Sequence, residues 1–190
     1  MTRRSLSLTP SSQRPSLSRV WEWYEFQRSL IREEKSRLFG ALARGESPSE
    51  SRYLGKEREE LDAEFAFQAA ELGALSTLGI LACTEAALQV DFKERVSAKR
   101  KDGLSRRFRR ASKKRGSRIR LEEDILDVWR ENSDTRIKRA VQGFKGALNL
   151  RHWLAHGRYW EPKLGRAARY DTAVVFEICG ELLLAVGLTP

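Results

Sequence analysis

Apolar residues recur along this chain at the spacing of an α-helix, and no segment alternates in the manner of a strand. The clearest pattern repeats every three or four residues through Leu61, Phe65, Ala69, Leu72, Ser76, Gly79 and Cys83. Proline, the strongest helix breaker, is absent between Pro48 and Pro162. We therefore predict an all-α fold, an up-and-down helical bundle.

Capping and stop residues divide this pattern into helices. Ser18 is a suitable N-cap for the first helix, and Gly45 is a stop signal after it. Ser133 or Asp134 can cap the helix that leads to Ala155. The predicted helices span residues 18–44, 56–100, 121–132, 133 or 134 to 155, and 167–186. The first carries a partial apolar stripe of Trp23, Phe26, Leu30 and Leu38.

A length of 190 residues suits one domain. Residues 1–16 are rich in Ser, Pro and Arg and are predicted to form a disordered basic tail, which leaves one helical domain over residues 17–190. Small residues crowd the stretch 69–87 and let helix backbones approach closely. Two interpretations of this stretch stay open, tight packing inside the bundle or a dimer surface.

The charge of the chain is concentrated in one segment. The formal net charge is +10, which favours polyanions such as nucleic acid or an anionic membrane surface. Residues 93–120 alone hold 14 cations and two anions, a local excess of +12, and form a basic insert in the predicted bundle. The insert is either an RNA-binding surface or a solvated, flexible loop. The candidate RNA-binding residues are Arg106, Arg107, Arg109, Arg110, Lys113, Lys114 and Arg115, with Arg158 further along the chain.

The remaining composition indicates a cytoplasmic protein. Cys83 and Cys179 are the two cysteines, both in apolar stretches, and we expect them to be buried thiols in a reducing compartment. No apolar core follows Met1, so no signal peptide is expected. The longest uncharged apolar run, residues 72–84, is too short to span a bilayer, and we expect no membrane partner.

Both histidines of the chain lie in the segment Arg151-His152-Trp153-Leu154-Ala155-His156. A spacing of four places His152 and His156 on the same helix face. Arg151 lies about 140° around the helix axis from His156, at roughly 100° per residue. The two can therefore act on one atom only if the helix ends near His156, as Gly157 suggests, or if a second chain supplies partners.

This segment resembles the motif of HEPN domains, in which an Arg, usually followed by a polar residue, precedes a His by a few positions. The order of the predicted helices is also similar to that family. The resemblance implies a metal-independent endoribonuclease, a toxin or antiviral effector, with no cofactor. It implies His156 as general acid or base, Arg151 as the phosphate clamp and His152 as an auxiliary polar group. It further implies RNA as substrate, a homodimer with a composite active site, and a cognate antitoxin or regulatory protein.

Other interpretations of the same residues stay open. Arg151 can be structural, pairing with an acid such as Glu177 or Glu181. His152 and His156 have the spacing of a helical metal-ligand pair, although no further His exists to complete a site. The chain can also be an inactive HEPN-like module that binds nucleic acid or a protein partner.

Overall fold

The computed structural model describes residues 14–131, 134–158 and 170–190, and every regular element in these ranges is a helix. The predicted all-α helical bundle is confirmed, with no strand in the described ranges. The predicted disordered tail lies mainly outside them. The elements are α1 (Leu17–Ala43), the 3₁₀ helix η1 (Ser51–Tyr53), α2 (Arg58–Ser97), α3 (Gly103–Arg115), the π-helix η2 (Leu121–Leu126), α4 (Asp127–Glu131), α5 (Thr135–Ala155) and α6 (Thr172–Ala185).

Capping side chains set the helix starts, and one predicted cap is wrong. The hydroxyl of Ser16 accepts a hydrogen bond from the Arg19 N–H at 3.2 Å, so Ser16 rather than Ser18 is the N-cap of α1. The helix begins earlier than predicted because Leu17 is buried against the core and belongs to its first turn. Asp134, one of the two predicted caps of α5, accepts from the Ile137 N–H at 3.0 Å.

The basic segment contains a helix. For this segment the sequence left a solvated, flexible loop as one open interpretation. Residues 103–115 form α3, and the carboxylate of Asp102 caps it by accepting from the Ser105 N–H at 2.9 Å. Phe108 is fully buried and packs edge-on against Phe92 and Trp129, with ring centroids 5.1 and 6.3 Å away. This aromatic anchor holds α3 on the bundle, so the loop interpretation is wrong for this stretch.

The helix predicted over residues 121–132 divides into the π-helix η2 and the short helix α4. Asp124, in η2, is buried and accepts a hydrogen bond from the Arg120 N–H at 2.9 Å. Its other oxygen lies 3.3 Å from Nε of Arg115, at the end of α3. One carboxylate therefore joins the end of the basic helix to the start of η2.

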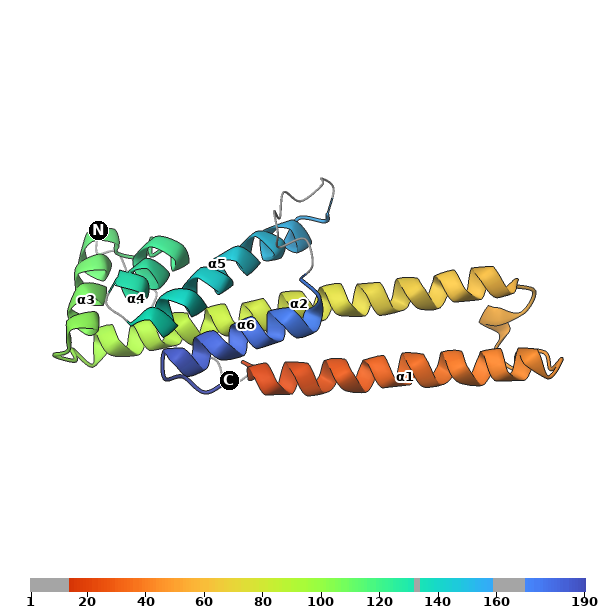
Figure 1. Ribbon diagram of the computed structural model, residues 1–190. Coiled ribbons are helices and arrows are strands. Elements are labelled where there is room, and N and C mark those ends of the chain that lie inside the picture. Colours follow the sequence, from red (N-terminus) through yellow and green to blue (C-terminus); the bar gives the residue numbers. More distant parts are fainter. Residues whose placement is uncertain (1–13, 132–133, 159–169) are drawn as a thin grey trace.

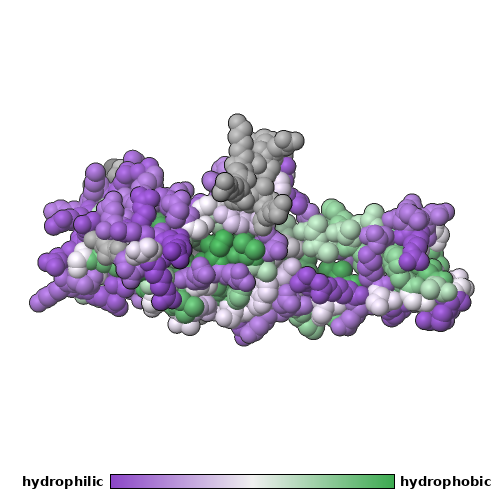
Figure 2. Space-filling view, in the orientation of Figure 1, coloured by the Kyte–Doolittle hydropathy of each residue, from purple (hydrophilic) through white to green (hydrophobic). Residues whose placement is uncertain are grey.

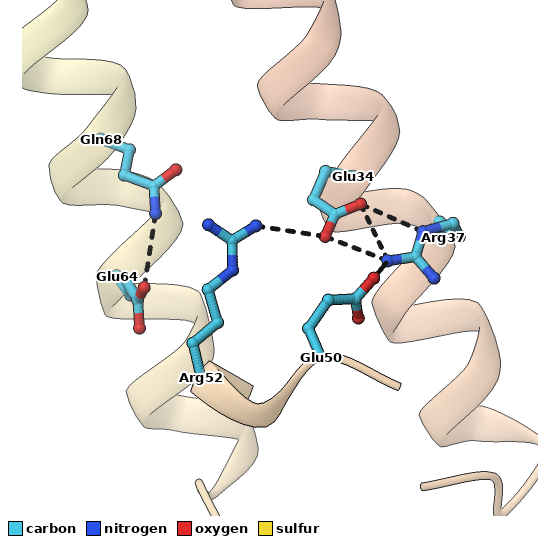
Figure 3. A network of polar contacts seen from close by, with 6 residues as sticks. All are labelled: Glu34, Arg37, Glu50, Arg52, Glu64 and Gln68. Carbon is cyan, nitrogen blue, oxygen red and sulfur yellow. Dashed lines mark hydrogen bonds and ion pairs between the residues drawn. The ribbon is translucent and has the colours of Figure 1, made fainter. Parts of the chain in front are cut away.

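A long antiparallel hairpin of α1 and the N-terminal half of α2 extends away from the other helices (Figure 1). Its outer end has a small core of its own, in which Leu38, Tyr53, Leu61 and Phe65 are buried. Ion pairs close the loop beside this core: Arg37 contacts Glu34 at 3.0 Å and also Glu50, and Arg52 reaches from the loop to Glu34 at 3.6 Å (Figure 3).

The second and larger core lies where the C-terminal half of α2 meets α3, η2, α4, α5 and α6. Helix α6 packs against both α2 and α5 (Figure 1). Trp21, near the start of α1, stacks on Phe176 of α6 with ring centroids 4.5 Å apart. Both cysteines are buried as predicted, and burial raises the pKa of the Cys179 thiol to about 12.

Small residues of α2 allow close packing at two points. A Cβ atom on Gly73 would lie 3.2 Å from Oγ1 of Thr172 on α6, and one on Gly79 would lie 3.4 Å from Val20 on α1. Tight packing inside the bundle is thus confirmed at these glycines. Other small residues of the same stretch, Ala69 among them, are exposed.

The predicted apolar stripe of α1 is covered only in part. Leu38 is buried, but Trp23, Phe26 and Leu30 are exposed by 49%, 58% and 43%. Helix α2 likewise contains an 18-residue window that is long and apolar enough to cross a membrane by composition, and 28% of that window is buried. Figure 2 shows hydrophobic surface over the N-terminal half of α2. The absence of a membrane partner stays a prediction.

Candidate functional site

The Arg151–His156 segment occupies the last turns of α5, as the sequence predicts. Buried Ala147, Leu148 and Leu150 hold this part of the helix against the core. The helix ends at Ala155, and His156 is its C-cap, donating its backbone N–H to the His152 carbonyl at 3.2 Å. Gly157 then has a φ of +79°, a left-handed conformation that favours glycine. The predicted helix end is confirmed.

The two histidines lie side by side on the solvent-exposed face of this helix end. Both side chains are exposed, and their ring centroids are 4.3 Å apart with the rings tilted by 57°. The predicted common face is therefore confirmed.

Arg151 points to another side of α5 and pairs with a carboxylate of α2. Its Nε lies 3.1 Å from Oε2 of Glu85, which is an ion pair without the geometry of a hydrogen bond. The partners Glu177 and Glu181 suggested by the sequence are wrong in this structure, because Glu85 lies directly opposite. The Arg151 side chain is 39% exposed although its Nε atom is buried, so only part of the guanidinium reaches solvent.

A pocket of about 310 Å³ joins Arg151 to the end of the basic segment. Its walls come from α2, α5 and the start of η2: Glu85, Arg120, Leu121, Glu122, Glu123, Leu148, Asn149, Arg151 and His152. His156 is not part of the lining and contacts His152 from outside. Arg120 is 2.7 Å from Glu123, so both arginines of the pocket have a carboxylate neighbour.

Four of the candidate RNA-binding residues form one face of α3. At roughly 100° per residue, Arg106, Arg110, Lys113 and Lys114 fall within about 100° of rotation, on the side opposite Phe108. All four are exposed, and in the described part of the chain none has an ion-pair partner. We call these four residues the basic face.

The other candidate cations form ion pairs or hydrogen bonds with neighbouring groups. Arg107 lies 3.0 Å from Glu131, Arg115 pairs with Asp124, and Arg109 donates to the backbone carbonyl of Arg100. Arg158, after the helix end, lies 2.7 Å from Glu71 of α2. This contact lowers the pKa of Glu71 and raises the pKa of Arg158.

Sequence reasoning assigned a site role to only two residues of the pocket, Arg151 and His152, and Glu85, Arg120 and Asn149 are among those that it missed. Glu85 lies in the middle of α2, and only the packing of α2 on α5 brings it to Arg151. Arg120 closes the basic segment but was not singled out, and Asn149 precedes Arg151 by two positions. The position of Arg120 directly before the acidic turn of η2 was an available signal.

Potential metal ligands are dispersed. Among the described residues, no three His, Cys, Asp or Glu side chains gather closely enough to hold a metal ion. The metal-ligand interpretation of His152 and His156 thus gains no third ligand from the part of the chain that is described.

Comparison of the chain with protein-family models, with curated proteins and with solved structures gave no match. The resemblance to HEPN domains therefore rests on the Arg151–His156 motif and the helix order, and it stays a prediction.

Proposed function

We propose that this chain is a metal-independent endoribonuclease of HEPN type that acts at the pocket beside α5. The observation that carries the proposal is the shared, solvent-open pocket of Arg151 and His152, with the ring of His156 4.3 Å from that of His152. These are the two chemical groups that cleavage at an RNA phosphate needs: a fixed cation and a group that exchanges protons near neutral pH.

The proposed reaction is an attack of the RNA 2′-oxygen on the adjacent phosphorus. One imidazole accepts the 2′-hydroxyl proton as the new P–O bond forms. As the bond from phosphorus to the 5′-oxygen breaks, an imidazolium returns a proton to that leaving oxygen. The guanidinium of Arg151 stabilises the charge that grows on the phosphate oxygens. The products are a 2′,3′-cyclic phosphate and a 5′-hydroxyl, and atoms and protons balance.

The structure favours a closer role for His152 than the sequence suggested, because His152 lines the pocket with Arg151 and His156 does not. In this proposal His152 faces the phosphate, and His156 shares its proton through their contact. Both take part in the proposed reaction.

The basic face provides the binding surface for the RNA backbone. Arginine and lysine side chains without competing acids bind phosphates without regard to sequence. Arg120, which follows α3 at the end of the basic segment, lines the same pocket as Arg151. The basic segment that contains α3 therefore reaches the pocket through Arg120.

The proposal includes partners and a location that follow from the resemblance. They are a homodimer with a composite active site, a cognate antitoxin or other regulatory protein that restrains cleavage, and the cytoplasm. A role as toxin or antiviral effector belongs to the same proposal.

The second candidate is an inactive HEPN-like module that binds nucleic acid or a protein. One observation favours it: Glu85 and Glu123 already neutralise Arg151 and Arg120 in the pocket. A phosphate must compete with these carboxylates, which weakens its binding at the site. Under this candidate the basic face binds RNA, and the RNA stays intact.

The test is cleavage of labelled RNA in the presence of EDTA by the wild-type protein and three variants. Arg151→Ala is expected to lose about 10²–10³-fold in rate, and His152→Asn and His156→Asn about 10²–10⁴-fold each. Arg32→Ala, on the exposed side of α1, is the matched control and should cut normally. Cutting that survives all three changes overturns the site assignment, whereas binding without any cutting supports the second candidate.

A further inference from the structure

A second pocket lies on the other side of the α5 end. Its volume is about 420 Å³, and residues of α1, α2, α5 and α6 line it. From α5 it takes Leu150, Trp153 and Leu154, whereas Arg151 and His152 line the pocket already described. The last turns of α5 therefore separate two pockets, and the proposed reaction uses one of them.

Aromatic rings and short side chains bound this second pocket. Four small residues of α2 line it: Ala69, Ala70, Gly73 and Ala74. Three partly buried aromatic residues line it from other parts of the chain: Tyr24, Trp153 and Tyr170. Gly146 of α5 leaves room for the Tyr170 hydroxyl, which lies 2.7 Å from the place of a Cβ atom there. We call these lining residues the aromatic pocket, and their shape suits a flat ring.

The charges of the aromatic pocket favour an uncharged ring over a phosphate group. Its described cations are Arg28 and Arg158. Arg28 lies 3.4 Å from Glu25, and Arg158 lies 2.7 Å from Glu71. The carboxylate of Asp171 also lines the pocket. Each described cation here thus has an acid beside it, in contrast to the cations on the basic face of α3.

His156 lies between the two pockets. At roughly 100° per residue, it falls about 40° from His152 and about 60° from Trp153, on opposite sides. Residues three and four apart are neighbours on a helix surface. Its ring centroid is 4.3 Å from that of His152, which faces the first pocket. A strand that crosses the end of α5 at the histidines therefore passes from one pocket to the other.

We infer that the aromatic pocket binds an unpaired base of the RNA, next to the phosphate that lies at Arg151 and His152. This inference rests on the proposed cleavage at those residues, and it names single-stranded RNA as the substrate. A base can stack on aromatic side chains only after it has left a helical stack. Such stacking tolerates any base, so the pocket sets the class of RNA rather than a sequence.

The test measures the binding of a strand that lacks the attacking 2′-hydroxyl and so resists the proposed reaction. The two probes are a labelled single-stranded decamer of deoxyadenosine and a decamer of the same backbone without bases. In fluorescence anisotropy, the wild-type protein should bind the strand with bases about five- to a hundredfold more tightly than the abasic strand. The ratio of the two affinities isolates the bases from the phosphates.

Ala74→Trp should remove this preference. A helical side chain leans toward the N-terminus of its helix, so the added indole occupies the space above Ala70. Ala63→Trp is the matched control, because Ala63 is exposed on the same side of α2, about three turns further out, and it should keep the wild-type ratio. Trp153→Leu, which removes one ring of the pocket, should also lower the ratio. Circular dichroism verifies that the variants keep their helices.

A wild-type protein without the preference overturns the inference, and so does a preference that survives both Ala74→Trp and Trp153→Leu. Adenosine alone tests a free nucleoside as the alternative occupant. Adenosine that binds the wild-type protein without displacing the decamer would overturn the path of the strand. No step of this test needs cleavage, so base-dependent binding by a protein that leaves RNA intact supports the pocket and contradicts only the proposed function.

Discussion

The basic face of α3 allows the salt dependence of RNA binding to be worked out from the structure. Its four cations, Arg106, Arg110, Lys113 and Lys114, are exposed and have no ion-pair partner in the described residues. Each phosphate that a cation neutralises on a single strand contributes about −0.7 to the slope of log K against log salt concentration. Four such contacts give a slope of about −3, so a fourfold rise in salt weakens binding about fiftyfold.

The informative perturbation removes half of this face. In Lys113→Gln/Lys114→Gln the slope should fall to about −1.4, and a fourfold rise in salt should weaken binding only about sevenfold. The matched control is Arg19→Gln/Arg32→Gln, which removes two exposed cations of α1. Because these two arginines lie away from the basic face, the control should keep the wild-type slope.

Fluorescence anisotropy of labelled single-stranded RNA over a series of salt concentrations measures both slopes. All proteins carry His156→Ala so that cleavage does not distort the titration. A wild-type slope near zero would refute the assignment of α3 as the RNA-binding helix. The same holds if the control pair lowers the slope as much as the change at Lys113 and Lys114.

Three further predictions concern the stability of the fold. Phe108→Ala should cost about 3–5 kcal/mol in urea unfolding, because Phe108 is fully buried between two aromatic rings, and an unchanged midpoint would contradict its role as anchor of α3. Asp102→Ala should cost about 1 kcal/mol at neutral pH. Hydrogen bonds from Ser105 lower the pKa of Asp102 below 3.8, so the difference between wild type and variant should persist above that pH and disappear in stronger acid. Burial raises the pKa of the Cys179 thiol from 9.0 to about 12, so the folded protein should resist thiol labelling at mildly alkaline pH. The free energy of unfolding should decline as the pH rises from about 9 toward 12, because in this range only the thiol of the unfolded chain ionises.

Local sequence signals were sufficient for the start and the end of α5. Asp134 as a cap, Gly157 as a stop and the four-residue spacing of the histidines each act within one or two helical turns. Such short-range rules hold because the backbone groups at a helix end must find partners close by. The shape of the motif segment was therefore predictable.

The partners of that segment were not predictable, because they come from distant parts of the chain. Glu85 meets Arg151 only through the packing of α2 on α5, and no local pattern distinguishes it from other acids. The same holds for the exposure of Trp23 and Phe26. Helical spacing identifies an apolar stripe, but it does not tell whether the same chain covers it. The π-helical turn at η2 likewise depends on the contacts of buried Asp124.

The central claim is that the 2′-hydroxyl of RNA, and no metal ion, attacks the phosphate at the pocket of Arg151 and His152. Mass spectrometry of the ends of RNA fragments formed in EDTA tests it most directly. We predict 2′,3′-cyclic phosphate and 5′-hydroxyl ends, together with complete resistance at a position where the 2′-hydroxyl is replaced by hydrogen. Intact RNA, 5′-phosphate ends, or cutting that requires an added divalent metal would contradict the account.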